Sequence, residues 1–229
     1  MDLHGYGPIL WAGTRQTIAL ALLSLLVSFV LGLVGASAKL SRNRTASGLA
    51  KLYTTLVRGV PDLVLMLMLF YGVQIGLNDL TDLLHIEQID IDPFVAGVLT
   101  IGFIYGAYFT ETFRGAFLAV PRGQIEAGIA VGMSTLQIFR RIQFPQMMRF
   151  ALPGIGNNWL VLVKATALVS IIGLADLVEA AQDAGKGALR PFLFMIIAAA
   201  IYLAITTLSN LVLIWLERHY STGVRKAEL

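Results

Sequence analysis

The feature that most constrains this chain is the length of its apolar runs. Four nearly uncharged stretches cover residues 17–38, 60–77, 94–117 and 192–216, and a weaker one covers 152–174. A helix needs roughly 20 apolar residues to cross a hydrocarbon core about 30 Å thick. Because a helix satisfies its own backbone hydrogen bonds inside lipid, the sequence predicts an all-α integral membrane protein with about five transmembrane helices.

The composition agrees with this fold class. Of the 229 residues, 57% are hydrophobic and 14% are charged, and the mean hydropathy is +0.76. Soluble domains carry about 25% charged residues. Five spans leave no room for a separate soluble domain, so residues 1–229 are expected to form a single transmembrane domain. The apolar run before Ala36 is longer than that of a signal peptide, which predicts a retained first span.

Basic residues are unevenly divided between the two sides of the predicted spans. With the N-terminus outside, thirteen Lys and Arg residues fall on the inner side and three on the outer side. The inner set is Lys39, Arg42, Arg44, Lys51, Arg58, Arg114, Arg122, Arg140, Arg141, Arg149, Arg218, Arg225 and Lys226. The positive-inside rule therefore predicts an outer N-terminus and a cytoplasmic C-terminus. These residues are scattered among span ends, so no nucleic-acid partner is expected.

One long hydrophilic stretch separates two spans, and residues 118–150 are predicted to form a cytoplasmic loop. From Gly123 it reads GQIEAGIAVGMSTLQIFRRIQFPQ, which predicts a short helix, a break at Gly132 and a second amphipathic piece. Glu126 stands in the first helical turn, and Ala127 is small enough to permit close approach. This arrangement suits docking to a partner in water, and an interfacial helix that merely joins two spans is the alternative.

Polar residues interrupt the spans at a few positions. A charge at the centre of a bilayer helix costs on the order of 3 kcal/mol, so each one calls for a partner or a water-filled path. Glu111 pairing with Lys164, Glu111 pairing with Arg114, and a hydrophilic substrate cavity all remain open. The cavity would be lined by Glu111, Asn157, Asn158, Lys164, Thr166 and Ser170. Asp62 follows Pro61, which suits a helix start, and is a more distant candidate.

The sequence contains no recognisable catalytic or nucleotide-binding motif. Gly185-Lys186-Gly187 lacks the first glycine and the Ser/Thr of a phosphate loop, so no ATP site is predicted. There is no cysteine, and the three histidines lie far apart without metal-binding spacing. We therefore predict that the chain is not an enzyme and binds no metal or cofactor itself.

The cytoplasmic segment resembles the EAA loop of binding-protein-dependent ABC importer permeases. The matching residues are Glu126, Ala127, Gly128, Gly132, Ile142 and Pro145. Gly128 departs from the usual alanine, which should weaken the helix by under about 1 kcal/mol. Further similarity to polar amino acid permeases runs through RGVPDLVLMLMLFYGVQ from Arg58, DIDPFVAG from Asp90 and ALPGIGNNW from Ala151. Over nearly its whole length the chain resembles Q-type permease subunits of histidine/lysine/arginine/ornithine importers.

This resemblance implies a type I ABC importer permease fold in the bacterial inner membrane, with a periplasmic N-terminus. The EAA loop would form a coupling helix that docks on a cytoplasmic ABC ATPase dimer, which would bind the ATP and Mg. The implied coupling residues are Glu126, Ala127, Gly128, Gly132 and Pro145, flanked by Arg140 and Arg141. The other implied partners are a periplasmic amino acid binding protein and a related permease subunit, which would form a heterodimer with this chain.

The implied function is ATP-driven import of amino acids by alternating access, and the implied substrates are the basic amino acids histidine, lysine, arginine and ornithine. A carboxylate in a low-dielectric cavity stabilises a cationic substrate, which makes Glu111 the first candidate and Asp62 the second. The alternative is an ATP-independent channel or secondary transporter. That alternative leaves the segment around Glu126 without a purpose.

Overall fold

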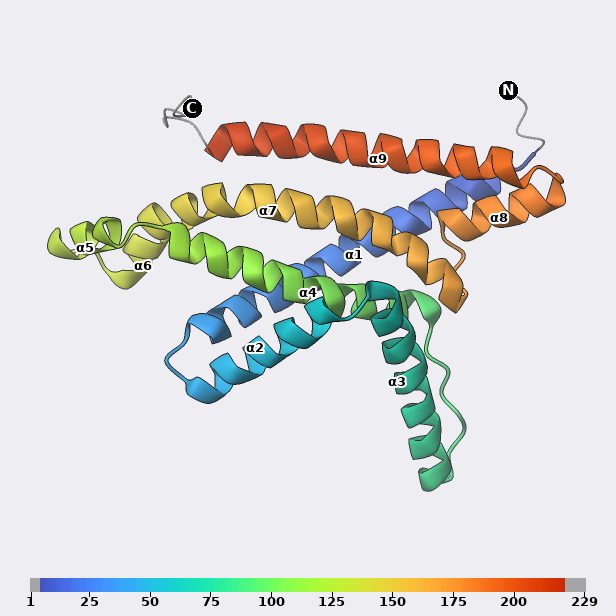
Figure 1. Ribbon diagram of the computed structural model, residues 1–229, viewed down its shortest axis with the longest axis horizontal. Helices are drawn as coiled ribbons and strands as arrows, with labels where there is room; N and C mark the ends of the chain where they lie inside the picture. The colour runs from blue at the N-terminus through green and yellow to red at the C-terminus, as the bar shows by residue number, and fades with distance from the viewer. Residues whose placement is uncertain (1–4, 221–229) are drawn as a thin grey trace.

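The structure is a computed structural model that describes residues 5–220, and these residues are almost entirely helical (Figure 1). The helices are α1 (Gly7–Leu40), α2 (Arg44–Gly59), α3 (Asp62–Leu84), α4 (Pro93–Ala119), α5 (Arg122–Ala130), α6 (Thr135–Ile138), α7 (Phe144–Ala165), α8 (Leu177–Gly187) and α9 (Pro191–Tyr220). A π-helical turn, Phe139–Gln143, joins α6 to α7, and a 3-10 helix, Thr166–Ile172, continues α7.

Five segments of the described chain are long and apolar enough to cross a membrane: α1, α3, α4, Thr135–Ile172 and α9. The prediction of five spans is therefore confirmed. Helix α1 begins at Gly7, earlier than the predicted start at residue 17, because Arg15 and Gln16 interrupt the apolar run without interrupting the helix. Pro8 in its first turn suits this helix start, because proline has no backbone N–H and the first N–H groups of a helix have no partner within it.

The polar stretch SRNRTASG after Lys39 looks like an ordinary loop in the sequence, but the sixteen-residue helix α2 begins within it at Arg44. The side chain of Asn43 accepts hydrogen bonds from the backbone N–H groups of Thr45 and Ala46 at 3.0 and 3.3 Å, so it caps α2. Helix α2 is amphipathic and packs on α1 and α4. Helix α8 was also not predicted, and the side chain of Asp176 caps it.

The core of the bundle lies between α1 and α4, which carry the most extensive helix contact in the described chain. Small residues let these helices approach closely. A Cβ atom on Gly32 would lie 2.5 Å from the Cβ of Phe109, and one on Gly102 would lie 2.5 Å from Cγ1 of Val27. The fully buried rings of Phe109 and Phe113 fill the space alongside. Helix α7 packs on α4, and α9 packs on α7 and α8.

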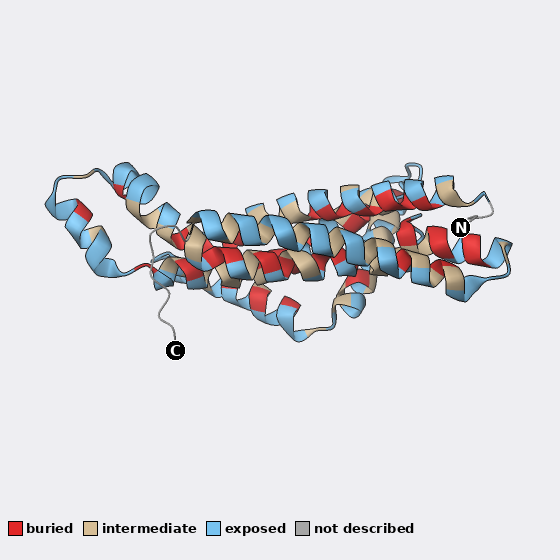
Figure 2. Cartoon of the chain, turned by 90° about the horizontal axis from the view of Figure 1, so that it is seen from above, coloured by how far each residue is buried: buried red, intermediate tan, exposed pale blue. Residues whose placement is uncertain are grey.

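Two parts of the chain stand clear of the bundle. Helix α3 points away from it (Figure 1), and Met66 and Thr81 are its buried residues. The hairpin of α5 and α6 projects from one end, with almost all of its surface exposed (Figure 2). The end of α9 lies at the same end of the bundle as this hairpin, opposite the start of α1 (Figure 1).

Candidate functional site

The segment between α4 and α7 is a compact hairpin, as the sequence predicts. Helix α5 ends at Ala130, and Gly132 adopts a φ of +76°, a left-handed conformation that favours glycine. Its backbone N–H donates to the carbonyl of Ile129 at 3.0 Å, which closes the turn. The side chain of Ser134 and that of Gln137 then form a capping box that starts α6. The predicted break at Gly132 is thus confirmed.

Gly128 is the buried residue of α5, and it faces the second arm of the hairpin. A Cβ atom at this position would lie 3.0 Å from Cδ1 of Ile142 and 3.1 Å from Cγ1 of Ile138. These distances are shorter than an ordinary contact, so glycine lets the two arms pack more closely than alanine does. From the sequence, Gly128 is expected only to weaken the helix, whereas the structure gives it a packing role.

The remaining coupling candidates lie on the hairpin surface. Glu126, Ala127, Arg140, Arg141 and Pro145 are all exposed. Arg140 and Arg141 help to line a shallow hollow of about 330 Å³. Apolar side chains stand beside these charges, since Ile129, Val131 and Leu136 are 61, 77 and 65% exposed. A surface that mixes charges with exposed apolar residues, on a hairpin clear of the bundle, is suited to docking another protein.

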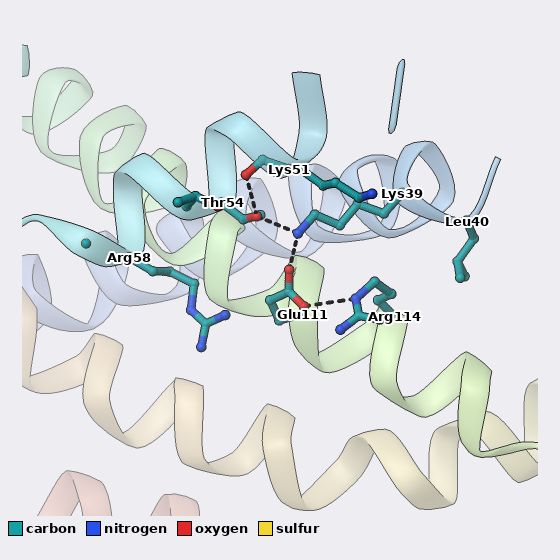
Figure 3. A pocket seen from close by; sticks show the side chains of 9 residues that line it. Lys39, Leu40, Lys51, Thr54, Arg58, Glu111 and Arg114 are labelled. Carbon is teal, nitrogen blue, oxygen red and sulfur yellow. Dashed lines mark hydrogen bonds and ion pairs between the residues drawn. The ribbon is translucent and has the colours of Figure 1, made fainter. Parts of the chain in front are cut away.

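Glu111 lies at the centre of a group of cations from three helices (Figure 3). Its Oε1 forms an ion pair with Nζ of Lys39 on α1, and its Oε2 accepts a hydrogen bond from Nε of Arg114 at 2.9 Å. Lys51 and Arg58 of α2 line the same hollow, which has a volume of about 630 Å³. The pairing of Glu111 with Arg114 is therefore present. Sequence reasoning missed Lys39, because only the packing of α1 on α4 brings it near.

The polar residues of α7 and its 3-10 extension divide into two groups. Asn158 is buried and donates to the hydroxyl of Thr112 at 3.0 Å. Thr166 and Ser170 donate to carbonyls of their own segment at 2.7 and 2.8 Å. Asn157 and Lys164 are exposed and lie two turns apart on one face of α7. Among residues 5–220, Lys164 takes part in no ion pair, so the suggested pair with Glu111 is not formed.

Asp62 is the first residue of α3, directly after Pro61, as its sequence context suggests. Its Oδ2 accepts a hydrogen bond from the hydroxyl of Tyr105 at 3.0 Å, which ties the start of α3 to α4. Asp62 does not line the hollow around Glu111. Within residues 5–220, no group of three or more His, Cys, Asp or Glu side chains is arranged to hold a metal ion.

Comparison with known proteins gives consistent matches. The family model for the binding-protein-dependent transport system inner membrane component matches residues 28–222. The histidine/lysine/arginine/ornithine transport system permease protein HisQ of Salmonella typhimurium is 60% identical, over 99% of this chain and 100% of that protein. The octopine transport system permease protein OccQ of Rhizobium radiobacter is 38% identical, over 98% of each chain.

Solved structures also match. A crystal structure of an amino acid ABC transporter with histidines aligns with a TM-score of 0.81 at 31% identity, covering 96% of this chain and 99% of that chain. An inward-facing structure of the MetNI methionine ABC transporter aligns with a TM-score of 0.73 at 17% identity, covering 93% of this chain and 97% of that one. The second match supports the fold alone.

Proposed function

Because the chain belongs to the family of binding-protein-dependent transport system inner membrane components, we propose that it is the permease subunit of an ATP-driven importer for basic amino acids. The chain spans the full length of relatives whose names specify histidine, lysine, arginine and ornithine. A second group of relatives is named for octopine, and another for arginine. These names support a substrate with a cationic side chain.

The observation that carries the importer mechanism is the projecting hairpin of α5 and α6. It offers an exposed docking surface around Glu126 and Ala127, while the chain itself has no nucleotide-binding motif. The energy must then come from a partner, which we propose to be a cytoplasmic ABC ATPase dimer that binds the ATP and Mg. Arg140 and Arg141 flank this surface and suit acidic groups on the ATPase. Movement of the hairpin would then open and close the permease.

We propose the same orientation that the charge distribution predicts, with a periplasmic N-terminus and a cytoplasmic hairpin and C-terminus. The hairpin and the end of α9 share one end of the bundle, which fits this assignment (Figure 1). Lys39, Arg58 and Arg114 line one hollow, and the positive-inside rule assigns these cations to the cytoplasmic side. Of the inner basic set, Arg225 and Lys226 lie outside the described residues.

A second, related permease is the partner we propose within the membrane. The face of α7 with Asn157 and Lys164 would then border the substrate pathway between the two subunits, where water solvates the lysine. The other predicted substrate residues are Glu111, Asn158, Thr166, Ser170 and Asp62. Their polar groups already have partners within the chain, so a substrate contact from them requires a conformational change.

The test is uptake into proteoliposomes that contain the chain with its co-purifying subunits. Labelled arginine, histidine and glutamine are supplied with and without ATP, and with and without the periplasmic binding protein. We expect uptake of arginine and histidine only when both ATP and binding protein are present. Uptake without ATP would instead establish a channel or secondary transporter, and the coupling role of the hairpin would be withdrawn.

A further inference from the structure

Two carboxylate oxygens near the start of α8, one from Asp176 and one from Glu179, are buried without a hydrogen-bond partner among the described residues. Asp176 lies in the link between the 3-10 helix and α8, and its side chain is fully buried. Its Oδ2 and the Oε2 of Glu179 are both shielded from solvent and have no hydrogen-bond partner among the described residues. Buried carboxylate oxygens are costly when they lack partners, and such groups are rare in native proteins. Two at one place call for an explanation.

Helix capping accounts for only one of the two carboxylate oxygens of Asp176. Its Oδ1 accepts a hydrogen bond from the backbone N–H of Glu179 at 2.9 Å, which starts α8. Asparagine and serine cap a helix about as well as aspartate does, so the cap does not require the negative charge. In the described part of the chain, neither Asp176 nor Glu179 forms an ion pair. Burial raises the pKa of Asp176 to about 6, as expected for a charge without a counter-ion.

The surroundings of this pair connect it to a hollow in the bundle. The hydroxyl of Thr17 on α1 accepts a hydrogen bond from the backbone N–H of Leu177 at 3.0 Å. Thr17 also helps to line a hollow of about 200 Å³, together with Trp159 and Ser209. Helix α8 packs on both α1 and α9, so the start of α8 lies close to a mostly apolar hollow that has Thr17 in its wall.

We propose that Asp176 and Glu179 bind the cationic side-chain group of the transported amino acid. This inference rests on the proposed function, in which the substrate is basic. A guanidinium presents five N–H donors in a planar fork, and an ammonium presents three, so either group supplies the donors that the two free oxygens lack. The structure holds the pair closed, and substrate reaches it in the alternating-access state in which α8 separates from α1.

The test uses the complete transporter in proteoliposomes with saturating, substrate-loaded binding protein at pH 8. The variants are Asp176→Asn, Glu179→Gln and both together. Asparagine keeps the capping oxygen, so Asp176→Asn removes the charge while α8 stays capped. The matched control is Asp183→Asn, on the same helix, where the carboxylate is about half exposed and pairs with Lys186 at 3.5 Å. Histidine, whose imidazole is neutral at this pH, serves as the uncharged substrate.

We expect Asp176→Asn and the double variant to lower the arginine and lysine transport rates by about tenfold or more, as for loss of a charged hydrogen bond. Histidine transport should fall by less than about twofold, because a neutral imidazole forms no charge-assisted hydrogen bond with these carboxylates. The Asp183→Asn variant should transport arginine, lysine and histidine like the wild type. Equal losses for charged and neutral substrates, or no loss at all, would overturn the site. A wild-type transporter that moves no basic amino acid would instead overturn the proposed function.

Discussion

The charged side chains Glu111 and Lys164 of the membrane region differ in whether they have an ion-pair partner. Glu111 has both of its oxygens occupied, one by Lys39 and one by Arg114. Lys164 is exposed and has no ion-pair partner among residues 5–220. A paired charge is tolerated inside the membrane region, whereas an exposed cation in a span requires water or a second protein. The geometry of Glu111 therefore favours a structural role over substrate contact.

This role predicts the effect of Glu111→Gln. The substitution leaves Lys39, whose side chain is 8% exposed, without its carboxylate. We expect a loss of about 3 kcal/mol in stability, at the low end for a broken buried pair because Glu111 is partly exposed. Thermal unfolding of the purified transporter measures the loss. Asp183→Asn removes an exposed pair and should cost under about 1 kcal/mol.

Uptake measurements distinguish a structural role of Glu111 from a role in binding the substrate. If its role is structural, Glu111→Gln reduces arginine and histidine uptake in the same proportion as it reduces the folded fraction. A selective loss of arginine uptake with unchanged thermal stability would contradict this prediction and make Glu111 a substrate ligand.

At the scale of elements, the hairpin depends on one backbone conformation. Gly132 has a φ of +76°, and its N–H donates to Ile129. Proline fixes φ near −65° and has no N–H, so Gly132→Pro is incompatible with the turn. We expect this variant to insert and assemble but to lose ATP-dependent uptake, because the two arms no longer dock as one surface. Uptake together with co-purification of the ATPase is the measurement.

A graded series makes the Gly132 prediction sharper. Asparagine tolerates the left-handed region and should retain most uptake, whereas alanine is strained there by roughly 1–2 kcal/mol and should lie between asparagine and proline. Gly123 lies in α5 with nothing close to its Cβ position, so Gly123→Ala is the control and should transport like the wild type. Full uptake by Gly132→Pro would show that the hairpin turn is not needed for coupling.

Helix α8 carries a pH dependence through Asp176. Its pKa is raised from 3.8 to about 6, first by burial and also by the nearby charge of Glu179. A raised carboxyl pKa means that the folded state holds the proton more tightly than the unfolded state. Wild-type stability is therefore complete below about pH 4, falls as the pH rises from 4 to 6, and stays lower above 6.

Asp176→Asn should remove this loss. We expect the variant to match the wild type near pH 4 and to be more stable above pH 6, by about 3 kcal/mol, which corresponds to a pKa raised from 3.8 to about 6. Melting temperatures measured from pH 4 to 8 test this. A variant less stable than the wild type at pH 8 would mean that the charge supports the fold, against the inference that it serves the substrate.

The sequence predicts the elements better than their contacts. Long apolar runs are a local property, so all five spans and the break at Gly132 could be predicted. Helix α2 was missed because its polar start, with Asn43 as the cap, reads as a loop when viewed alone. Lys39 and Glu111 are far apart in sequence, and Leu177 meets Thr17 only through the folding of α8 onto α1. These pairings follow from packing, which periodicity does not determine.

The whole molecule leaves apolar and polar surface that one chain does not cover. Few residues of α3 are buried, although it is apolar enough to span a membrane. The face of α7 with Asn157 and Lys164 is open as well. Lipid suits the surface of α3 but not a lysine ammonium. The second permease proposed above would complete a water-filled pathway along α7 and so account for the exposed lysine.

Because the chain contains no cysteine, single-cysteine variants can test this pathway directly. Thiolates react only where water reaches them, so Lys164→Cys in the assembled transporter should react with a charged, membrane-impermeant thiol reagent. The reaction should depend on whether ATP and loaded binding protein are present, since alternating access exposes the pathway to one side at a time. Leu203→Cys, at a 67% exposed position on α9 that we expect to face lipid, is the control and should stay unreactive. If Lys164→Cys is as inert as Leu203→Cys in every state, this face of α7 does not line the pathway.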